Sequence, residues 1–226
     1  MKIMVVNGSP KGKASNTNVM VSSFLKGAQE AGAETVNVFL SEKKIEHCRG
    51  CHSCWVRGPG QCVINDDMLG VLSLAGGTDV IAFATPVYFE NISGMLKVFM
   101  DRMTMIGSPH PQKDVKGESQ DLKPTETRTP KLMMISNCGN PDSDEFQVIS
   151  HWIKRVALKM HTEVIAEIYA TQGKLLTAPT EGLESTISKY LQLLEKAGKE
   201  IATEKRLSVT TEKLLAQNLI SDKVEI

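Results

Sequence analysis

The chain has 226 residues, and its 26 basic and 26 acidic side chains give a formal net charge of zero at pH 7. This balance argues against a broad nucleic-acid surface, because such binding depends on phosphate neutralisation by clustered Lys and Arg. Hydrophobic residues make up 41% of the chain, which provides for a sizeable core and excludes a disordered or collagen-like chain. No apolar run approaches the roughly 18 uncharged residues of a membrane span.

The first residues, MKIMVVNGSP, contain an apolar run that ends at Asn7. This run is too short for the core of a signal peptide, so we expect a cytoplasmic protein without a membrane partner. In that compartment the five cysteines are not expected to form a disulfide framework. Four of them lie between Cys48 and Cys62, and this clustering calls for a separate explanation.

Along the chain, short strand-like apolar runs alternate with longer helical ones, as in βαβ units around a parallel sheet. Strands are expected at residues 2–7, 34–40, 79–85, 131–137 and 163–171. Helices are expected at residues 15–32, 66–75, 145–160 and 183–204, and around the stripe formed by Leu96, Phe99, Met100 and Met103. We therefore predict an α/β fold, with one domain over residues 1–205 and a C-terminal extension over residues 206–226.

The segment 107–130 interrupts this pattern. It has no periodicity, contains four prolines, and is longer than ordinary connections in a compact domain. Long loops of this kind serve as lids, binding loops or contacts between subunits. We expect this insertion to lie near a partner subunit or near the active site.

The turn after the first predicted strand, residues 8–17 (GSPKGKASNT), concentrates hydroxyl, amide and lysine side chains where a helix begins. Free backbone N–H groups and the positive end of a helix bind phosphate at such turns. The turn is not a Walker A loop, because three residues rather than four separate Gly8 from Gly12 and Ala14 follows Lys13. The G-x-G-x-x-G pattern of dinucleotide sites is also missing. A terminal monophosphate fits the turn best, and an ordinary helix cap is the alternative.

Two further loops follow predicted strands at the edge where open α/β sheets bind ligands. In residues 85–91 (TPVYFEN) a proline fixes a turn before the adjacent aromatics Tyr88 and Phe89, on which a flat conjugated ligand could stack. In residues 138–141 (CGNP) the glycine permits a turn that aims backbone N–H groups at ring heteroatoms. The alternative is that each loop only caps its own strand.

The segments GSPKGKASNT and TPVYFENISGMLKVFMDR resemble the flavodoxin-like NAD(P)H-dependent FMN reductases, and this resemblance covers residues 1–173. It implies a three-layer sandwich, in which a five-stranded parallel sheet of order 2-1-3-4-5 has helices on both faces, and it implies FMN as the cofactor. It places Ser9, Lys11, Ser15, Asn16 and Thr17 around the phosphate, and Pro86, Val87, Tyr88, Phe89, Asn137, Cys138 and Gly139 along the isoalloxazine ring. Relatives in this family form dimers or tetramers through insertions like residues 107–130, which implies a homodimer or homotetramer.

The cysteine cluster consists of Cys48, Cys51, Cys54 and Cys62, in the pattern C-x2-C-x2-C-x7-C. Four thiolates can hold one [4Fe–4S] core, and the interleaved Arg49 and Arg57 would lower the thiol pKa values. Structural zinc is the main rival, although its ligand pairs are usually separated by about a dozen residues. A redox-active dithiol and a loop without metal are further alternatives. Cys138 lies outside the cluster and is interpreted as a small buried residue.

The same spacing, within the loop 47–63, resembles the compact motif of the iron–sulfur flavoproteins, a branch of the FMN reductase family. The resemblance implies that electrons pass between a reduced donor and an acceptor through FMN and a [4Fe–4S] cluster, with NAD(P)H, a quinone or ferredoxin as candidate partners. Because the cofactors carry this chemistry, we name no catalytic side chain. The alternatives are an NAD(P)H:quinone or FMN reductase without a cluster, and a flavin- or zinc-binding module without turnover.

Overall fold

The computed structural model describes residues 1–57, 60–107, 112–113, 119–120, 129–178 and 181–220. Its central sheet has five parallel strands in the order β2-β1-β3-β6-β7. These strands are β1 (Lys2–Asn7), β2 (Glu34–Phe39), β3 (Val80–Pro86), β6 (Lys131–Asn137) and β7 (Val164–Ala170). A separate antiparallel pair, β4 (Gln112–Lys113) and β5 (Ser119–Gln120), lies within the insertion. Without that pair, the order of the main sheet is the predicted 2-1-3-4-5, so the fold prediction is confirmed.

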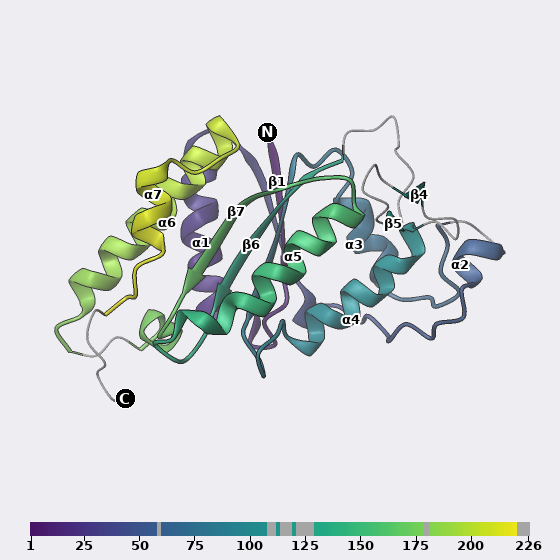
Figure 1. Ribbon diagram of the computed structural model, residues 1–226, viewed down its shortest axis with the longest axis horizontal. Coiled ribbons are helices and arrows are strands. Elements are labelled where there is room, and N and C mark those ends of the chain that lie inside the picture. Colours follow the sequence, from purple (N-terminus) through teal and green to yellow (C-terminus); the bar gives the residue numbers. More distant parts are fainter. Residues whose placement is uncertain (58–59, 108–111, 114–118, 121–128, 179–180, 221–226) are drawn as a thin grey trace.

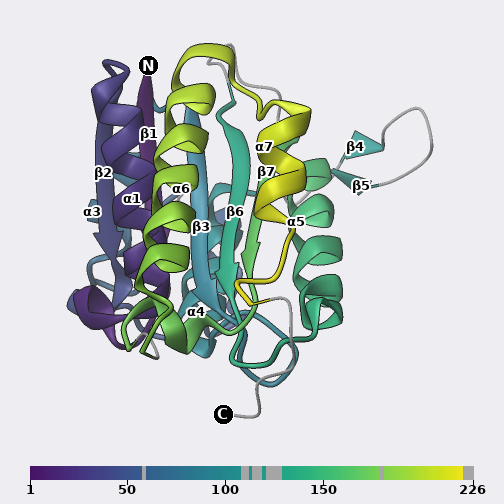
Figure 2. The same ribbon diagram turned by 90° about the vertical axis from the view of Figure 1, so that its left-hand side faces the viewer.

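Helices cover both faces of this sheet (Figure 1 and Figure 2). One face carries α1 (Asn16–Glu30), α6 (Glu184–Glu204) and α7 (Val209–Leu215), and the other carries α3 (Met68–Leu74), α4 (Gly94–Arg102) and α5 (Gln147–Lys159). The short helix α2 (Ser53–Val56) lies in the cysteine loop, beyond α4. Single 3-10 turns occur at Gly12–Ala14, Leu40–Glu42, Met103–Ile106, Ser143–Phe146 and Gly173–Leu176. None of the helices in the described ranges combines the length and apolar character needed to cross a membrane.

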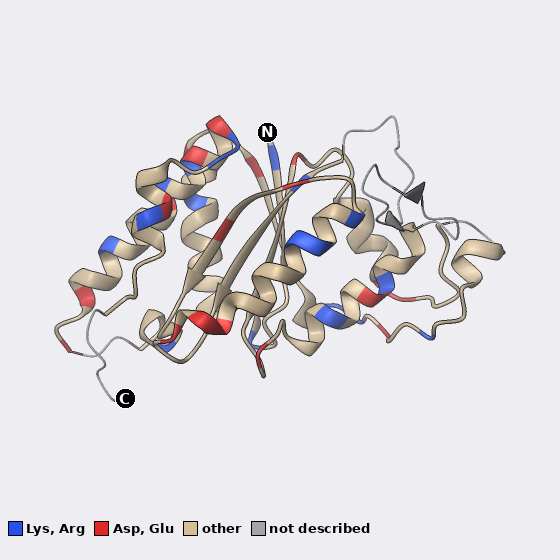
Figure 3. Cartoon of the chain, viewed as in Figure 1, with Lys and Arg blue, Asp and Glu red and all other residues tan. Residues whose placement is uncertain are grey.

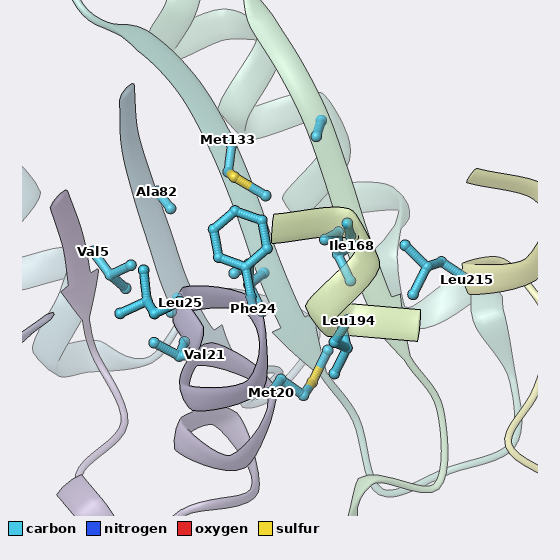
Figure 4. Packing of buried hydrophobic residues seen from close by; sticks show 14 of the residues in the cluster. Val5, Met20, Val21, Phe24, Leu25, Ala82, Met133, Ile168, Leu194 and Leu215 are labelled. Atoms are coloured by element: carbon cyan, nitrogen blue, oxygen red, sulfur yellow. The ribbon is translucent and has the colours of Figure 1, made fainter. Parts of the chain in front are cut away.

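The core consists of two apolar layers, one on each side of the sheet. Successive side chains of a strand point to opposite faces, so Ile3 and Val5 pack in the layer under α1 and α6, whereas Met4 and Val6 pack in the layer under α3 to α5. Figure 4 shows the first of these layers, in which Phe24 lies between the sheet and Leu194 of α6. Strands buried on both faces, here β1, β3 and β6, read as nearly continuous apolar runs, and this is why their bounds were predicted to within one residue.

Helix α3 begins later than predicted. Asp66 was predicted to lie in its first turn, but the helix begins at Met68. The Asp66 carboxylate instead accepts hydrogen bonds from the backbone N–H of Met68 (3.1 Å) and from Arg102. Most of the insertion 107–130 and residues 221–226 lie outside the described residues, so their predicted roles stay predictions. The same holds for the division of the chain at residue 205, although Leu215 and Leu219 of the C-terminal segment lie in the core layer shared with α1 and α6.

Helices α1 and α6 are in direct backbone contact through two glycines. A Cβ atom added at Gly27 would lie 1.8 Å from the carbonyl oxygen of Glu195, and one added at Gly198 would lie 1.9 Å from that of Phe24. Real Cβ atoms do not approach backbone atoms this closely, so a side chain at either position would force the helices apart. The two glycines therefore fix the spacing of this layer.

Gly27→Ala is expected to lower the free energy of unfolding by about 1–3 kcal/mol, because overpacking a core costs more than the roughly 1 kcal/mol that Ala contributes to a helix relative to Gly. The matched control is Gly70→Ala in α3, where the added methyl group meets nothing within 4 Å; it should stabilise the protein. Urea denaturation of both variants measures the difference. Equal changes in the free energy of unfolding of the two variants would show that the close contact between α1 and α6 does not determine the stability.

Candidate functional site

Three loops meet at the carboxyl edge of the sheet, after β1, β3 and β6. The backbone N–H of Gly8 donates to the carbonyl of Ala84 (2.7 Å), and that of Val87 donates to the carbonyl of Asn137 (2.8 Å). Parallel pairing also sets Pro86 opposite Asn137. The structure therefore places the segments 8–17, 86–91 and 137–139 side by side, which is the arrangement that ligand sites of open α/β sheets use.

The first of these segments ends in a capped helix. Ser15 Oγ donates to the carbonyl of Gly12 (2.7 Å) and accepts from the backbone N–H of Asn18 (3.0 Å), so its hydroxyl group acts as the N-cap of α1. The first backbone bond within the helix runs from Val19 to Ser15. The N–H groups of Asn16 and Thr17 precede it and therefore have no acceptor within the helix. The turn thus offers backbone donors and the positive end of a helix to an anion.

The remaining predicted phosphate residues differ in their exposure. Ser9 and Thr17 are buried, whereas Lys11 is exposed. The Asn16 Oδ1 atom accepts from the Thr177 hydroxyl (2.6 Å), which ties the start of α1 to the segment after β7. Lys13 pairs with Glu42 at 3.5 Å instead of facing the turn.

A buried amide connects the phosphate turn to the end of β6. Asn137 Nδ2 donates to Thr17 Oγ1 at 2.8 Å, and Gly173 packs so closely that an added Cβ would lie 2.9 Å from Asn137 Oδ1. Asn7, at the end of β1, accepts from the backbone N–H of Ser9 (3.2 Å), and its Nδ2 atom is buried with no hydrogen-bond partner in the part of the chain that the structure describes. Neither Asn7 nor Gly173 was among the residues predicted from the sequence. The sequence feature that could have identified Asn7 is an amide side chain at the end of an apolar strand-like run.

The loop after β3 presents its aromatic residues to solvent. Phe89 is fully exposed and Tyr88 is 45% exposed. A tight turn, closed by Tyr88 N–H to Asn91 O (2.8 Å) and Asn91 N–H to Tyr88 O (3.2 Å), holds them there. Its two central residues, Phe89 and Glu90, have φ angles of 48° and 65°, and the left-handed conformation costs about 1–2 kcal/mol for each residue other than glycine. Strain of this kind is typical of ligand-binding turns.

Ser93 and helix α4 connect this loop to the cysteine loop. Ser93 caps α4 by accepting from the backbone N–H of Leu96, and its hydroxyl donates to the carbonyl of Gly8 (2.6 Å). Lys97 pairs with Asp101 on the exposed side of the helix at 2.5 Å. Figure 3 shows basic and acidic residues close together along this helix. Arg102, in contrast, is buried at the far end of α4.

Cys138 is buried, as predicted, next to the loop after β6. Its thiol donates to the carbonyl of Asn140 (3.2 Å). Burial, reinforced by the nearby charge of Glu145, raises the pKa of this thiol to about 11. The side chain therefore stays protonated near neutral pH. The backbone of Cys138 is also engaged within the protein, because its N–H donates to the carbonyl of Ala170 (3.0 Å) and its carbonyl accepts from the N–H of Gly173 (2.8 Å).

Cys138 is expected to be alkylated last among the five cysteines of metal-free protein at pH 8, because the thiolate is the nucleophile and the raised pKa leaves very little of it. Cys48 and Cys51 are exposed, and Cys54 and Cys62 are half-buried. Mass spectrometry of iodoacetamide-treated protein over time measures the order. Alkylation of Cys138 together with the exposed pair would mean that its loop opens readily.

The four clustered cysteines line one pocket, together with the end of α4. Trp55 Nε1 of α2 donates to the carbonyl of Thr104 (2.8 Å), which holds the loop against the turn after α4. Within the described ranges, no three His, Cys, Asp or Glu side chains converge closely enough to hold a metal ion as they stand. The thiols nevertheless share one pocket and influence one another, since the neighbouring thiols help to raise the pKa of Cys54 after the larger effect of burial. This donor set fits a thiolate-bound metal centre.

The expected lowering of the thiol pKa is found at Cys51. Hydrogen bonding from Ser53, with a smaller contribution from the charge of Arg49, lowers the pKa of Cys51. Burial raises the pKa of Cys54 instead, because that thiol faces the pocket interior. The pKa values of Cys51 and Cys54 therefore shift in opposite directions.

The order of the sheet and the helices on both of its faces define a flavodoxin-like fold. Residues 1–119 of the 226 match the family model described as NADPH-dependent FMN reductase, and the chain belongs to this family. It is similar to an iron–sulfur flavoprotein of Archaeoglobus fulgidus, 37% identical over 107 residues that cover 47% of each chain. It is also similar to one of Methanosarcina thermophila, 36% identical over 106 residues that cover 47% of this chain and 54% of that protein. The alignments span about half the length of these curated relatives. The predicted family and its iron–sulfur flavoprotein branch are confirmed.

Solved structures support the fold. An FMN-dependent NADH-azoreductase from Bacillus anthracis in complex with FMN has a TM-score of 0.64 at 18% identity, over 89% of this chain and 99% of that chain. An NAD(P)H:quinone oxidoreductase from Methanothermobacter marburgensis has a TM-score of 0.62 at 14% identity, over 89% and 96% of the two chains. At these identities the similarity establishes the fold alone.

Proposed function

We propose that this chain is an FMN-dependent oxidoreductase that binds FMN at the carboxyl edge of its sheet. The observation that carries the proposal is the convergence of the three loops there, joined by the hydrogen bonds from Gly8 to Ala84, from Val87 to Asn137 and from Asn137 to Thr17. Family membership supports FMN as the ligand. When bound, FMN accepts two electrons as a hydride and can release them singly.

The chain's own residues would bind and orient the cofactor. The backbone N–H groups of Asn16 and Thr17, at the positive end of α1, would bind the phosphate. The exposed Tyr88 and Phe89 would lie along the isoalloxazine ring. The N–H of Gly139 would face its polar edge, whereas the N–H of Cys138 already donates to the carbonyl of Ala170. The set proposed is the one expected from the sequence: Ser9, Lys11, Ser15, Asn16, Thr17, Pro86, Val87, Tyr88, Phe89, Asn137, Cys138 and Gly139.

We also propose that Cys48, Cys51, Cys54 and Cys62 hold a [4Fe–4S] cluster. Their shared pocket supports this proposal, and so do the relatives named iron–sulfur flavoprotein. Helix α4 connects the two proposed sites. Its cap Ser93 contacts Gly8 of the phosphate turn, and its last residue, Arg102, lines the cysteine pocket about 13 Å away along nine residues.

The proposed partners are an electron donor and an electron acceptor, with NAD(P)H, a quinone or ferredoxin as candidates. The cytoplasmic location and assembly as a homodimer or homotetramer also stay predictions. Light scattering of the intact protein tests the assembly: the measured mass should be two or four times that of a single chain, and a mass of one chain would contradict it.

Anaerobic purification followed by flavin and iron analysis tests both cofactors. The expected result is one FMN and about four irons per chain, with bleaching of the flavin absorbance on addition of NADPH, NADH or reduced ferredoxin. Protein with FMN and reductase activity but no iron would favour the reductase without a cluster. That alternative rests on the observation that no three ligating side chains of the described residues converge closely enough to hold an ion. One zinc per chain, without turnover, would favour the binding module.

A further inference from the structure

Arg102 is the last residue of α4 and is buried beneath the cysteine pocket. Its side chain is 1% exposed. Nη1 donates to Asp66 Oδ2 (2.5 Å) and to the carbonyl of Glu46 (2.9 Å), and Nη2 donates to Asp66 Oδ1 (3.1 Å). A charge buried this deeply is expensive unless it is paired and hydrogen-bonded, so its position calls for an explanation.

The partner of Arg102 ties both ends of the cysteine segment together. Asp66 is also 1% exposed and accepts from the backbone N–H groups of Glu46 (2.9 Å) and Met68 (3.1 Å). Burial alone would raise the pKa of Asp66, but the hydrogen bonds from Arg102 and from these N–H groups leave it below its ordinary value. Glu46 precedes the first clustered cysteine and Asp66 follows the last. The ion pair therefore closes the base of the loop.

The pair alone does not satisfy Arg102. Its Nε atom is buried without a hydrogen-bond partner among the described residues, and the side chain lines the same pocket as all four cysteines. The Cys62 thiol lies beside the guanidinium and is one of its interaction partners. The cysteine thiols become negatively charged thiolates when they bind a metal. The free Nε–H of the buried Arg102 guanidinium can donate to such a thiolate, and the positive charge of the guanidinium can balance the negative charge of the metal centre.

We propose that Arg102 is a positioning and charge-compensating residue for the metal centre of the cysteine loop. Its guanidinium holds both ends of the loop through Asp66 and Glu46, and its positive charge stabilises the more negative, reduced form of the centre. No electron or proton passes through Arg102. The role rests on the proposed iron–sulfur cluster and adds to it one prediction, a higher reduction potential than the same cluster would have without the guanidinium.

The test compares Asp66→Asn with the double variant Asp66→Asn/Arg102→Gln. Both lack the buried carboxylate, so the pair differs only in the guanidinium, and no unpaired negative charge is left behind. At a fixed potential, the ratio of reduced to oxidised cluster should be at least tenfold lower in the double variant, which is 59 mV for a one-electron couple. A dye-mediated anaerobic titration followed by visible absorbance measures it. Lys97→Gln, an exposed cation on the same helix, is the control and should leave the potential unchanged.

A purely structural role for Arg102 would change stability or iron content without changing the potential. Equal potentials in iron-loaded Asp66→Asn and Asp66→Asn/Arg102→Gln would therefore overturn the assignment while leaving the cluster in place. Wild-type protein without iron would overturn the cluster itself, and the role of Arg102 with it. If the double variant does not fold, Asp66→Asn alone decides: its uncompensated guanidinium should raise the potential above that of the wild type, and an unchanged value overturns the assignment.

Discussion

Cys51→Ala is expected to lose most of its iron under anaerobic conditions, falling from about four irons per chain in the wild type to fewer than one. Losing one thiolate leaves a corner of the cluster to water and exposes it to oxidation. FMN should stay bound, because its three loops follow β1, β3 and β6, whereas Cys51 lies in the loop after β2. Iron analysis and flavin fluorescence after denaturation measure the two cofactors independently.

Cys138→Ala is the matched control for this result. It removes a thiol that is buried at the other site and lies outside the cysteine pocket, so both iron and FMN should be retained. Loss of iron from both variants in equal measure would mean that the ligands are assigned wrongly. Wild-type protein that carries zinc in place of iron would contradict the electron-transfer function and leave the reductase without a cluster.

The central strands β1, β3 and β6 were predictable because they are buried on both faces. Between Lys2 and Asn7 the first run contains no polar side chain, and the observed strand has these bounds. The phosphate turn was predictable from its composition, but the hydrogen-bond partner of each hydroxyl group in it was not. Ser15 is fully engaged as the cap of α1, so the backbone of the next two residues is the better donor for a phosphate.

The pair of Asp66 and Arg102 could not be read from the sequence. The two residues lie 36 positions apart, and neither stands in a periodic pattern that reports a contact. Asp66 looked like an acidic residue in the first turn of a helix, which is a common and favourable place. Only the packing of α4 against the cysteine loop shows that this carboxylate belongs to a buried pair. For the same reason, the close approach of Gly27 to Glu195 and of Gly198 to Phe24 could not be predicted from the sequence.

Asn16→Asp is expected to weaken FMN binding about tenfold to a hundredfold while leaving the fold as stable as before or slightly more stable. Asn16 is the first residue of α1, where an acidic side chain interacts favourably with the helix dipole. The same charge repels a phosphate dianion at that turn and replaces an amide donor, and a hydrogen bond to a charged group contributes about 1.5–3 kcal/mol. The hydrogen bond that Asn16 Oδ1 accepts from Thr177 can be kept by the carboxylate.

Val209→Asp separates the local effect of this charge from a change in overall charge. Val209 is the first residue of α7, follows the cap Ser208, and is exposed, so it matches Asn16 in helix position while lying on a helix that contributes nothing to the proposed flavin site. Fluorescence titration with FMN should give a larger dissociation constant for Asn16→Asp only, and thermal unfolding of the flavin-free proteins should show neither variant destabilised.

Equal FMN affinity in both variants would place the phosphate away from the start of α1. A loss of FMN that accompanies unfolding would mean that Asn16 supports the turn and does not contact the phosphate. The Asn16→Asp carboxylate is expected to favour folding and to oppose FMN binding. Because these two effects have opposite signs, the substitution tests directly whether the FMN phosphate lies at the start of α1.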